Sequence, residues 1–134
     1  MIKDIQPPIV ENIAVAIVRE LNNENETEWN VYVINLREEA IEGVLVSSNG
    51  YGTYNEEEVK TSTLRHFLDI IPANSFKKIE PIVESLFGIN NEYWVSFFIN
   101  NIMYDKKFIF LAETLKDEYF TTVPIINKKG VMIK

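Results

Sequence analysis

The chain has 134 residues, of which 20 are acidic and 13 basic, and its net charge is −7. It has no cysteine and one histidine, His66, which excludes disulfides, thiolate metal sites and cysteine nucleophiles and leaves at most one imidazole for metal binding or proton transfer. The length suits one domain over residues 1–134, and the acidic balance argues against binding to nucleic acid or anionic membranes, since both require basic patches.

β-Branched residues dominate the apolar composition, with 18 isoleucines and 12 valines against 8 leucines and 5 alanines. These side chains lose rotamer freedom in helices and fit the pleated surface of a sheet, so the composition favours strands. The sequence shows neither an apolar leader nor an apolar run of about 20 residues, the length that a membrane span needs. We therefore expect a cytoplasmic location.

The first periodic segment, residues 9–21, fits two secondary structures. Apolar side chains four residues apart suit a helix, whereas the alternation of Ile13, Val15 and Ile17 with small apolar residues suits a strand. The segment is followed by a polar loop, 22–28, and by residues 29–36, which alternate as a clear strand. Two such runs around a polar loop are typical of a hairpin, so we predict a strand.

The middle of the chain is predicted to hold two further strands. Residues 41–48 form the first, which the glycine-containing segment 49–52 is expected to end. The glutamates 56–58 are assigned to the loop beyond it. Residues 60–71 contain the second strand, centred on 64–68, and 72–75 turn the chain.

The last third is also predicted to consist of short strands. Residues 76–82 could form a strand, or 81–87 a short helix, whereas 93–99 alternate strongly and are apolar on both faces, which predicts a central strand. Residues 108–111 are expected to pair back on that strand across a turn at 104–106.

Near the C-terminus we expect a single helical turn within 114–120, with Thr114 as its N-cap. Residues 123–126 and 131–133 then form a closing hairpin around a turn at 127–130, with Gly130 in its last position.

These elements give about eight strands and at most one or two short helical turns. No helix long enough for a βαβ crossover is predicted, so a parallel α/β sheet is unfavourable. The expected fold is all-β, an antiparallel two-sheet β-sandwich in which immunoglobulin-like connections are an option. A small closed barrel is the second architecture considered.

Few residues suggest chemistry. Lys60, Arg65 and His66 form the one compact cationic group in the middle of the chain, but Arg65 and His66 point to opposite faces of a strand. The glycine spacing before Lys60 does not fit a phosphate-binding loop. Tyr51 and Tyr54 lie beside glycines in an expected loop, which makes them the better aromatic candidates for contact with a ligand.

The remaining groups suit structural roles. The acidic clusters in loops do not fit the spacing of a calcium-binding loop, and we interpret them as solvated charge. Trp29 and Trp94 stand at strand positions, where aromatic side chains more often fill a core. We expect no metal site and no cofactor.

Four segments carry a resemblance to a known family: 28–32 (EWNVY), 48–51 (SNGY), 60–66 (KTSTLRH) and 72–80 (PANSFKKIE). In them the chain resembles a small bacterial family of about this length, and the resemblance covers nearly the whole chain. Some members are labelled phenylalanyl-tRNA synthetase alpha subunit. The resemblance implies a synthetase-related function, with binding of ATP or phenylalanine.

Three functions are therefore expected. The first is a non-catalytic interaction or accessory module, not an enzyme, which binds a protein partner or a second copy through an exposed sheet edge or face. The second is a small-ligand binder or enzyme that uses Lys60, Arg65 and His66 with the nearby tyrosines. The third is the synthetase-related function that the resemblance implies.

Overall fold

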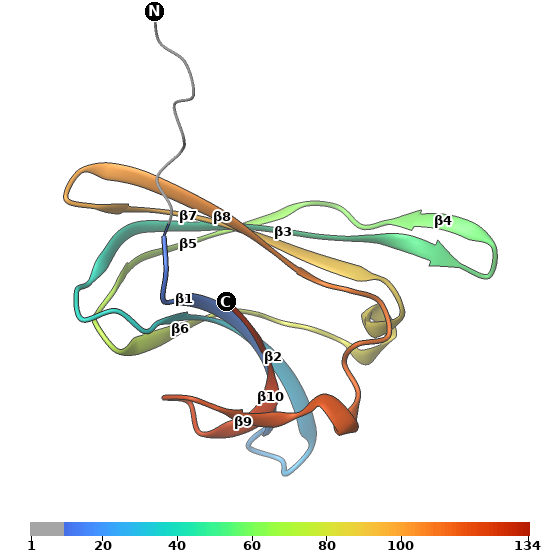
Figure 1. Cartoon of the computed structure of the whole chain (residues 1–134). Helices are drawn as coiled ribbons and strands as arrows, with labels where there is room; N and C mark the ends of the chain where they lie inside the picture. The colour runs from blue at the N-terminus through green and yellow to red at the C-terminus, as the bar shows by residue number, and fades with distance from the viewer. Residues whose placement is uncertain (1–9) are drawn as a thin grey trace, which may run out of the picture.

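The structure, a computed structural model, describes residues 10–134. Within this range two antiparallel sheets of five strands each pack face to face, which confirms the predicted all-β sandwich (Figure 1). Sheet A consists of β1 (Ile13–Leu21), β2 (Thr27–Asn35), β6 (Ser75–Pro81), β9 (Thr121–Val123) and β10 (Lys128–Ile133). Sheet B consists of β3 (Ile41–Tyr54), β4 (Glu57–Lys60), β5 (Leu64–Ile71), β7 (Asn90–Ile99) and β8 (Ile102–Phe110).

The strand order is β6-β2-β1-β10-β9 in sheet A and β4-β3-β7-β8 in sheet B, where β5 also pairs with β3. Two 3₁₀ turns, η1 (Glu84–Gly88) and η2 (Asp117–Tyr119), are the helical elements of the described residues. The predicted first strand is β1, and Ile9 of that prediction lies outside the described residues.

The burial of both faces of β1 explains why residues 13–18 are apolar at every position. Ile13, Val15 and Ile17 join the main core between the sheets, as the alternation predicts. Ala14 and Ala16 face the other way and pack in a second, smaller cluster on the far side of sheet A. That cluster includes Val18, Ile34, Val123 and Ile126, so β1 is buried on both faces.

The prediction that residues 49–52 end the third strand is wrong, because β3 continues to Tyr54. The glycines serve close packing here: a Cβ on Gly50 would lie 2.9 Å from the Ile89 side chain, and one on Gly52 would lie 3.2 Å from it. The turn is made instead by Asn55 and Glu56, both with positive φ. Glu57 and Glu58 consequently lie in β4 and not in a loop.

Two other turns lie elsewhere than predicted. β7 and β8 are joined at Asn100 and Asn101, both in the left-handed region that asparagine tolerates, so 104–106 lie within β8. The closing hairpin exists, but its turn spans 124–127 and Gly130 pairs with Val18 inside β10.

The two alternatives for residues 76–87 both occur, one after the other, as β6 and η1. The helical turn expected within 114–120 is η2, but Thr114 does not cap it. Its hydroxyl donates to the carbonyl oxygen of Leu111 at 2.6 Å, and Lys116 stands at the cap position without a side-chain hydrogen bond.

Gly130→Ala tests the contact between β1 and β10. The added Cβ would collide with the carbonyl oxygen of Ile17 and lie 2.8 Å from Cα of Val18, so the two strands would have to separate. We expect the free energy of unfolding in urea to fall by about 1–3 kcal/mol. Gly88→Ala is the control, because its Cβ would meet nothing nearer than 3.7 Å. Equal effects of the two substitutions would contradict this interpretation.

Candidate functional site

The β3–β4 arm, residues 51–60, carries three of the five candidate residues. It projects beyond the sandwich (Figure 1). Tyr51 and Lys60 face each other across the two strands and line one hollow of about 450 Å³ on the arm. Tyr54 pairs with Glu57 near the tip and does not line this hollow. These tyrosines thus lie in a strand, not in the predicted loop.

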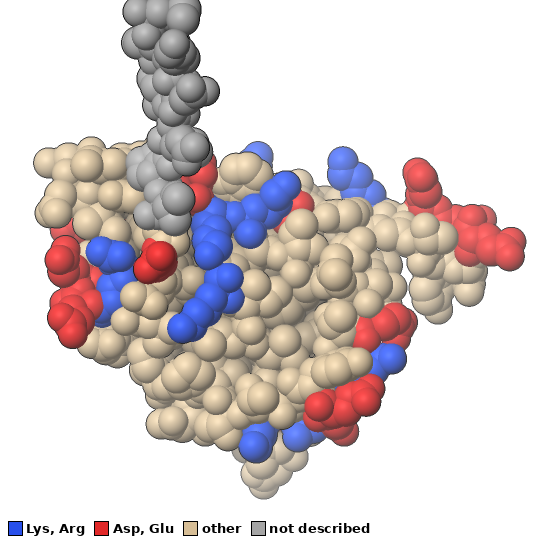
Figure 2. Space-filling view, in the orientation of Figure 1, with Lys and Arg blue, Asp and Glu red and all other residues tan. Residues whose placement is uncertain are grey.

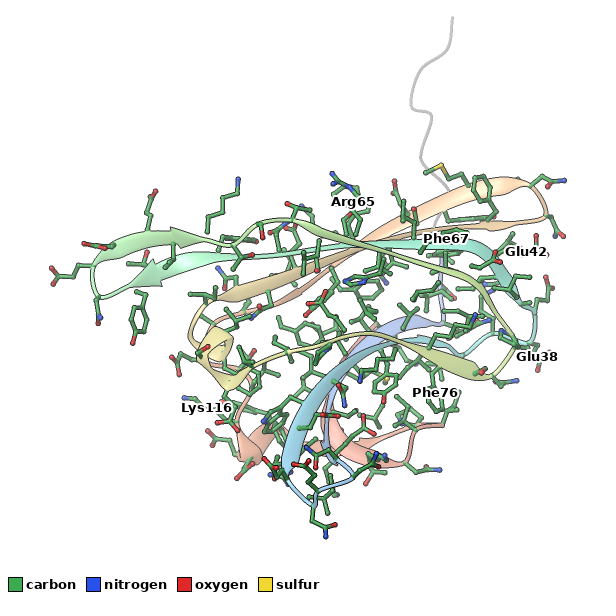
Figure 3. All side chains as sticks on the ribbon, turned by 180° about the vertical axis from the view of Figure 1, so that it is seen from behind. Glu38, Glu42, Arg65, Phe67, Phe76 and Lys116 are labelled. Carbon is green, nitrogen blue, oxygen red and sulfur yellow. The ribbon has the colours of Figure 1, made fainter. Side chains whose placement is uncertain are left out.

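Arg65 and His66 lie on opposite faces of β5, as strand alternation requires. Arg65 is exposed on the outer face of sheet B, the face that points away from sheet A, whereas His66 points toward sheet A (Figure 3). Lys60 stands on the arm, opposite Tyr51. The structure therefore does not bring Lys60, Arg65 and His66 into one site.

His66 belongs to a polar cluster that joins the two sheets. Its Nε2 lies 2.9 Å from Oε1 of Glu80 on β6, and the Ser48 hydroxyl donates to the same oxygen at 2.6 Å. Burial, and then the negative charge of Glu80, raise the pKa of Tyr93 well above its ordinary value of 10.0. Ser48 and His66 lie on sheet B and Glu80 lies on β6 of sheet A, so Glu80 is the acceptor that links the two sheets at this point.

This cluster borders a cavity of about 110 Å³ between the sheets. Its lining includes Ser48, Thr61, Leu64, Glu80 and Tyr93. Ligand pockets usually measure about 300 Å³ or more, so this cavity suits water or a very small group. It forms where residues 61–63 leave the pairing with β3 between β4 and β5.

Ser48, His66 and Glu80 are the residue types of a hydrolase triad, but they are not arranged as one. In a triad the histidine lies between the serine and the acid, so that it can take the serine proton. Here Ser48 and His66 both bond to one oxygen of Glu80. Sequence reasoning found no signal for Glu80, because a register shift in the β2–β6 pairing next to it breaks the alternation. Ser48 follows the inward alternation of β3, but its acceptor lies on the other sheet, which a local pattern does not show.

The outer face of sheet B carries large exposed apolar side chains from four of its strands, β3, β5, β7 and β8. Phe67 is 66% exposed, Met103 54% and Trp94 43%. The complete set is Leu45, Phe67, Ile70, Trp94, Phe98 and Met103. β7 is central, as predicted, but Trp94 is not the core residue that its strand position suggested, whereas Trp29 is.

Strand register arranges this outer face in rows across the sheet. One row consists of Phe67, Leu45, Ser96 and Asp105, and the next of Arg65, Ser47, Trp94 and Lys107. Nζ of Lys107 lies 5.3 Å from the centroid of the Trp94 ring and 3.9 Å from a carboxylate oxygen of Glu92. The apolar side chains are thus interspersed with charges of both signs.

One end of the outer face has an acidic hollow of about 460 Å³, lined by Glu42, Gly43, Asp69, Ile70, Phe98 and Asn101. It forms at irregularities in the β3 pairing, where Gly43 has a φ of +57° and Asp69 a φ of +59°. A Cβ on Gly43 would lie 3.1 Å from the Phe98 ring, so glycine lets the ring rest on the backbone. The hollow combines two carboxylates with an aromatic wall.

Near η2, the side chain of Arg19 packs against the aromatic rings of Trp29 and Phe120. The guanidinium of Arg19 lies 5.8 Å from the Trp29 ring centroid and 5.4 Å from that of Phe120, and it pairs with Asp117 at 3.1 Å. The Trp29 indole N–H donates to Glu84 at 2.8 Å. These contacts join β1 and β2 to the two 3₁₀ turns, η1 and η2.

A second carboxylate cluster lies on the far side of sheet A. Glu20 accepts hydrogen bonds from Tyr32 at 2.5 Å and Asn30 at 3.0 Å, and pairs with Lys128 at 2.5 Å. Burial raises the pKa of Glu20, but the hydrogen bonds from Lys128, Tyr32 and Asn30 outweigh it and hold the pKa below its ordinary value of 4.5.

No protein-family model, curated protein or solved structure matches the chain. Within residues 10–134, the structure contains no group of three His, Asp or Glu side chains that could hold a metal ion. None of the helical segments in that range is long and apolar enough to cross a membrane.

The Glu20 cluster predicts a dependence of stability on pH. Because the folded pKa lies below 4.5, the charge on Glu20 stabilises the fold above that pH, and this contribution is lost as the pH falls through the folded pKa. The difference in unfolding free energy between the wild type and Glu20→Gln should therefore shrink below pH 4.5. Glu24→Gln, in the exposed β1–β2 turn, is the control that removes a carboxylate outside this cluster. A constant difference for Glu20→Gln would contradict this assignment.

We predict that the Glu80 cluster stabilises the fold by linking the two sheets. Glu80→Leu leaves Ser48 and His66 without their acceptor and should lower the free energy of unfolding by about 1–3 kcal/mol. It should also bring the pKa of Tyr93 closer to the ordinary tyrosine value, as ultraviolet absorbance would show. Glu24→Leu is the matched control. A Glu80→Leu variant as stable as this control would refute the role as a link between the sheets.

Proposed function

We propose that the protein is a non-catalytic protein-binding module and that the outer face of sheet B is its binding surface. The observation that carries this proposal is the set of six large apolar side chains on a sheet face that no residue within 10–134 covers. Proteins that work as monomers rarely expose large contiguous apolar patches, and such patches with a polar rim mark interaction sites.

The composition and shape of this face suit a protein partner. Tryptophan, phenylalanine, methionine and arginine are enriched at protein interfaces, and the face presents Trp94, Phe98, Met103 and Arg65 together. Small ligands require concave pockets that bury most of their surface. The broad outer face of sheet B offers a large contact area, which suits a protein partner.

The surface charge supports the choice of this face. Acidic side chains gather at the tip of the β3–β4 arm, where Glu56, Glu57 and Glu58 lie (Figure 2). Repulsion between such carboxylates opposes pairing of exposed strands with other chains. Association is therefore directed away from the arm and toward the face of sheet B.

Two further features belong to this proposal. We propose immunoglobulin-like connections, because β1–β2–β6 and β5–β3–β7–β8 follow part of the strand order of such a sandwich. β6 lies at a sheet edge, where that fold has a further strand, and β9 and β10 extend the opposite edge. We also place the protein in the cytoplasm.

Two alternative functions rest on separate observations. Small-ligand binding is favoured by the hollow that Tyr51 and Lys60 share on the arm. The synthetase-related function rests on the sequence resemblance. Calorimetric titration with ATP and with phenylalanine tests the latter, and saturable binding of either compound would replace a purely protein-binding role.

The binding surface is tested by photo-crosslinking in cells that express the chain at its natural level. A photoreactive phenylalanine at Phe67, which is highly exposed on the outer face, should yield discrete protein adducts. The same group at Leu21, equally exposed but at the end of β1 in sheet A, is the control. Trp94→Ser should weaken the Phe67 adducts without unfolding the chain, because Trp94 is outside the core. Adducts no stronger at Phe67 than at Leu21 would contradict the proposal.

A further inference from the structure

We propose that the partner on the outer face of sheet B is a second copy of this chain, bound face to face about a two-fold axis that runs across the strands. This inference rests on the proposed function, because it uses the same binding surface. It adds the identity of the partner and the register of the contact. The order of side chains on β3, β5 and β7 supports both.

The proposed axis lies along the row formed by Phe67, Leu45 and Ser96, which are cross-strand neighbours. On β5, Arg65 precedes Phe67 by two residues and Asp69 follows it by two. On β7, Trp94 and Phe98 flank Ser96 in the same way. Two residues span about 7 Å along a regular strand, so Trp94 and Phe98 lie at similar distances on either side of the axis. On β5 the register shift places Asp69 opposite Val44, one residue from Leu45, so Asp69 lies nearer to the axis than Arg65 does. The long side chain of arginine can span this offset.

Opposite charges meet when a second copy is turned about this axis. Each strand then lies over the same strand of the partner, with its direction reversed, so Arg65 faces Asp69 of the partner subunit. Asp69 lines the acidic hollow with Glu42, Ile70 and Phe98, and an arginine can enter such a hollow with both carboxylates and the aromatic ring in reach. In Figure 3 the labelled side chains follow in the order Arg65, Phe67 and Glu42 along the sheet. The contact forms twice, once in each direction.

The same rotation brings apolar side chains together. Leu45 meets Leu45 of the partner subunit on the axis, and Trp94 faces Phe98 of the partner subunit. The strands of the two subunits run nearly antiparallel, which is the aligned arrangement of two packed sheets. Such an interface has aromatic contacts at its centre and charged pairs around them, as stable protein interfaces do.

The alternative axis, parallel to the strands, is unfavourable. Arg65, Ser47, Trp94 and Lys107 form one row from β5 to β8. Rotation about an axis between β3 and β7 would place Arg65 over Lys107 of the partner subunit. Like charges in contact disfavour that register.

The proposed register contains one repulsive contact, which gives a sharp test. Asp105 lies in the axial row, at the edge strand β8, and therefore meets Asp105 of the partner subunit. Removing this charge with Asp105→Asn should tighten the dimer. Glu24→Gln, which removes one negative charge in the exposed β1–β2 turn, is the control for the general repulsion between two acidic chains, and Asp105→Asn should tighten the dimer more than this control does.

Sedimentation equilibrium on the full chain, up to about 1 mM, is the experiment. We expect a monomer–dimer equilibrium whose dissociation constant rises about tenfold or more in Arg65→Glu, because the new glutamate faces Asp69 of the partner subunit. Asp105→Asn should lower it. Lys116→Glu is the control, since it makes the same change in net charge at an exposed position away from the face (Figure 3). Circular dichroism verifies that each variant is folded.

Each other outcome overturns the inference. A dimer that Arg65→Glu and Lys116→Glu weaken equally, or that Asp105→Asn tightens no more than Glu24→Gln does, uses another surface or register. A chain that stays monomeric while Phe67 crosslinks to a different protein refutes the second copy and leaves the proposed function standing. A monomeric chain without face-specific adducts refutes both.

Discussion

The pairing of β3 with three other strands is the constraint on which the rest of the structure depends. β3 pairs with β4 and β5 along one edge and with β7 along the other, so it joins four of the five strands of sheet B. Its inward side chains, such as Val44 and Val46, are fully buried in the core, and its outward ones, such as Leu45, necessarily face away from it. The β3–β4 arm, the cavity and the apolar outer face all follow from this one strand.

Irregularities in that pairing produce two of the hollows of sheet B. Where residues 61–63 leave β3, the cavity beside Ser48 and Glu80 opens between the sheets. Where the register shifts near Gly43 and Asp69, the acidic hollow forms beside Phe98. Bulges interrupt the alternation of a strand and redirect side chains, and this explains why Glu42 and Asp69 lie together beside Phe98.

The sequence could predict the strands whose two faces differ in environment, but not all the turns. Alternation at 29–36 and 93–99 identified β2 and β7 because side chains of a strand point alternately to its two faces. Glycine was a misleading signal for turns: Gly50, Gly52 and Gly130 lie inside strands, where their lack of a Cβ permits close packing. The asparagines at 100 and 101 made the turn between β7 and β8 instead, since their side chains tolerate positive φ.

The sequence by itself determined an acidic, cysteine-free β-protein in which Arg65 and His66 point to opposite faces, because composition and strand alternation are local properties. Only the tertiary structure decided what each face meets. His66 reaches Glu80 because β5 and β6 are neighbouring edges of different sheets, and Trp94 is exposed because no residue within 10–134 covers the outer face of sheet B. Periodicity shows that a strand has two faces, but which of them is covered depends on packing between segments far apart in the chain.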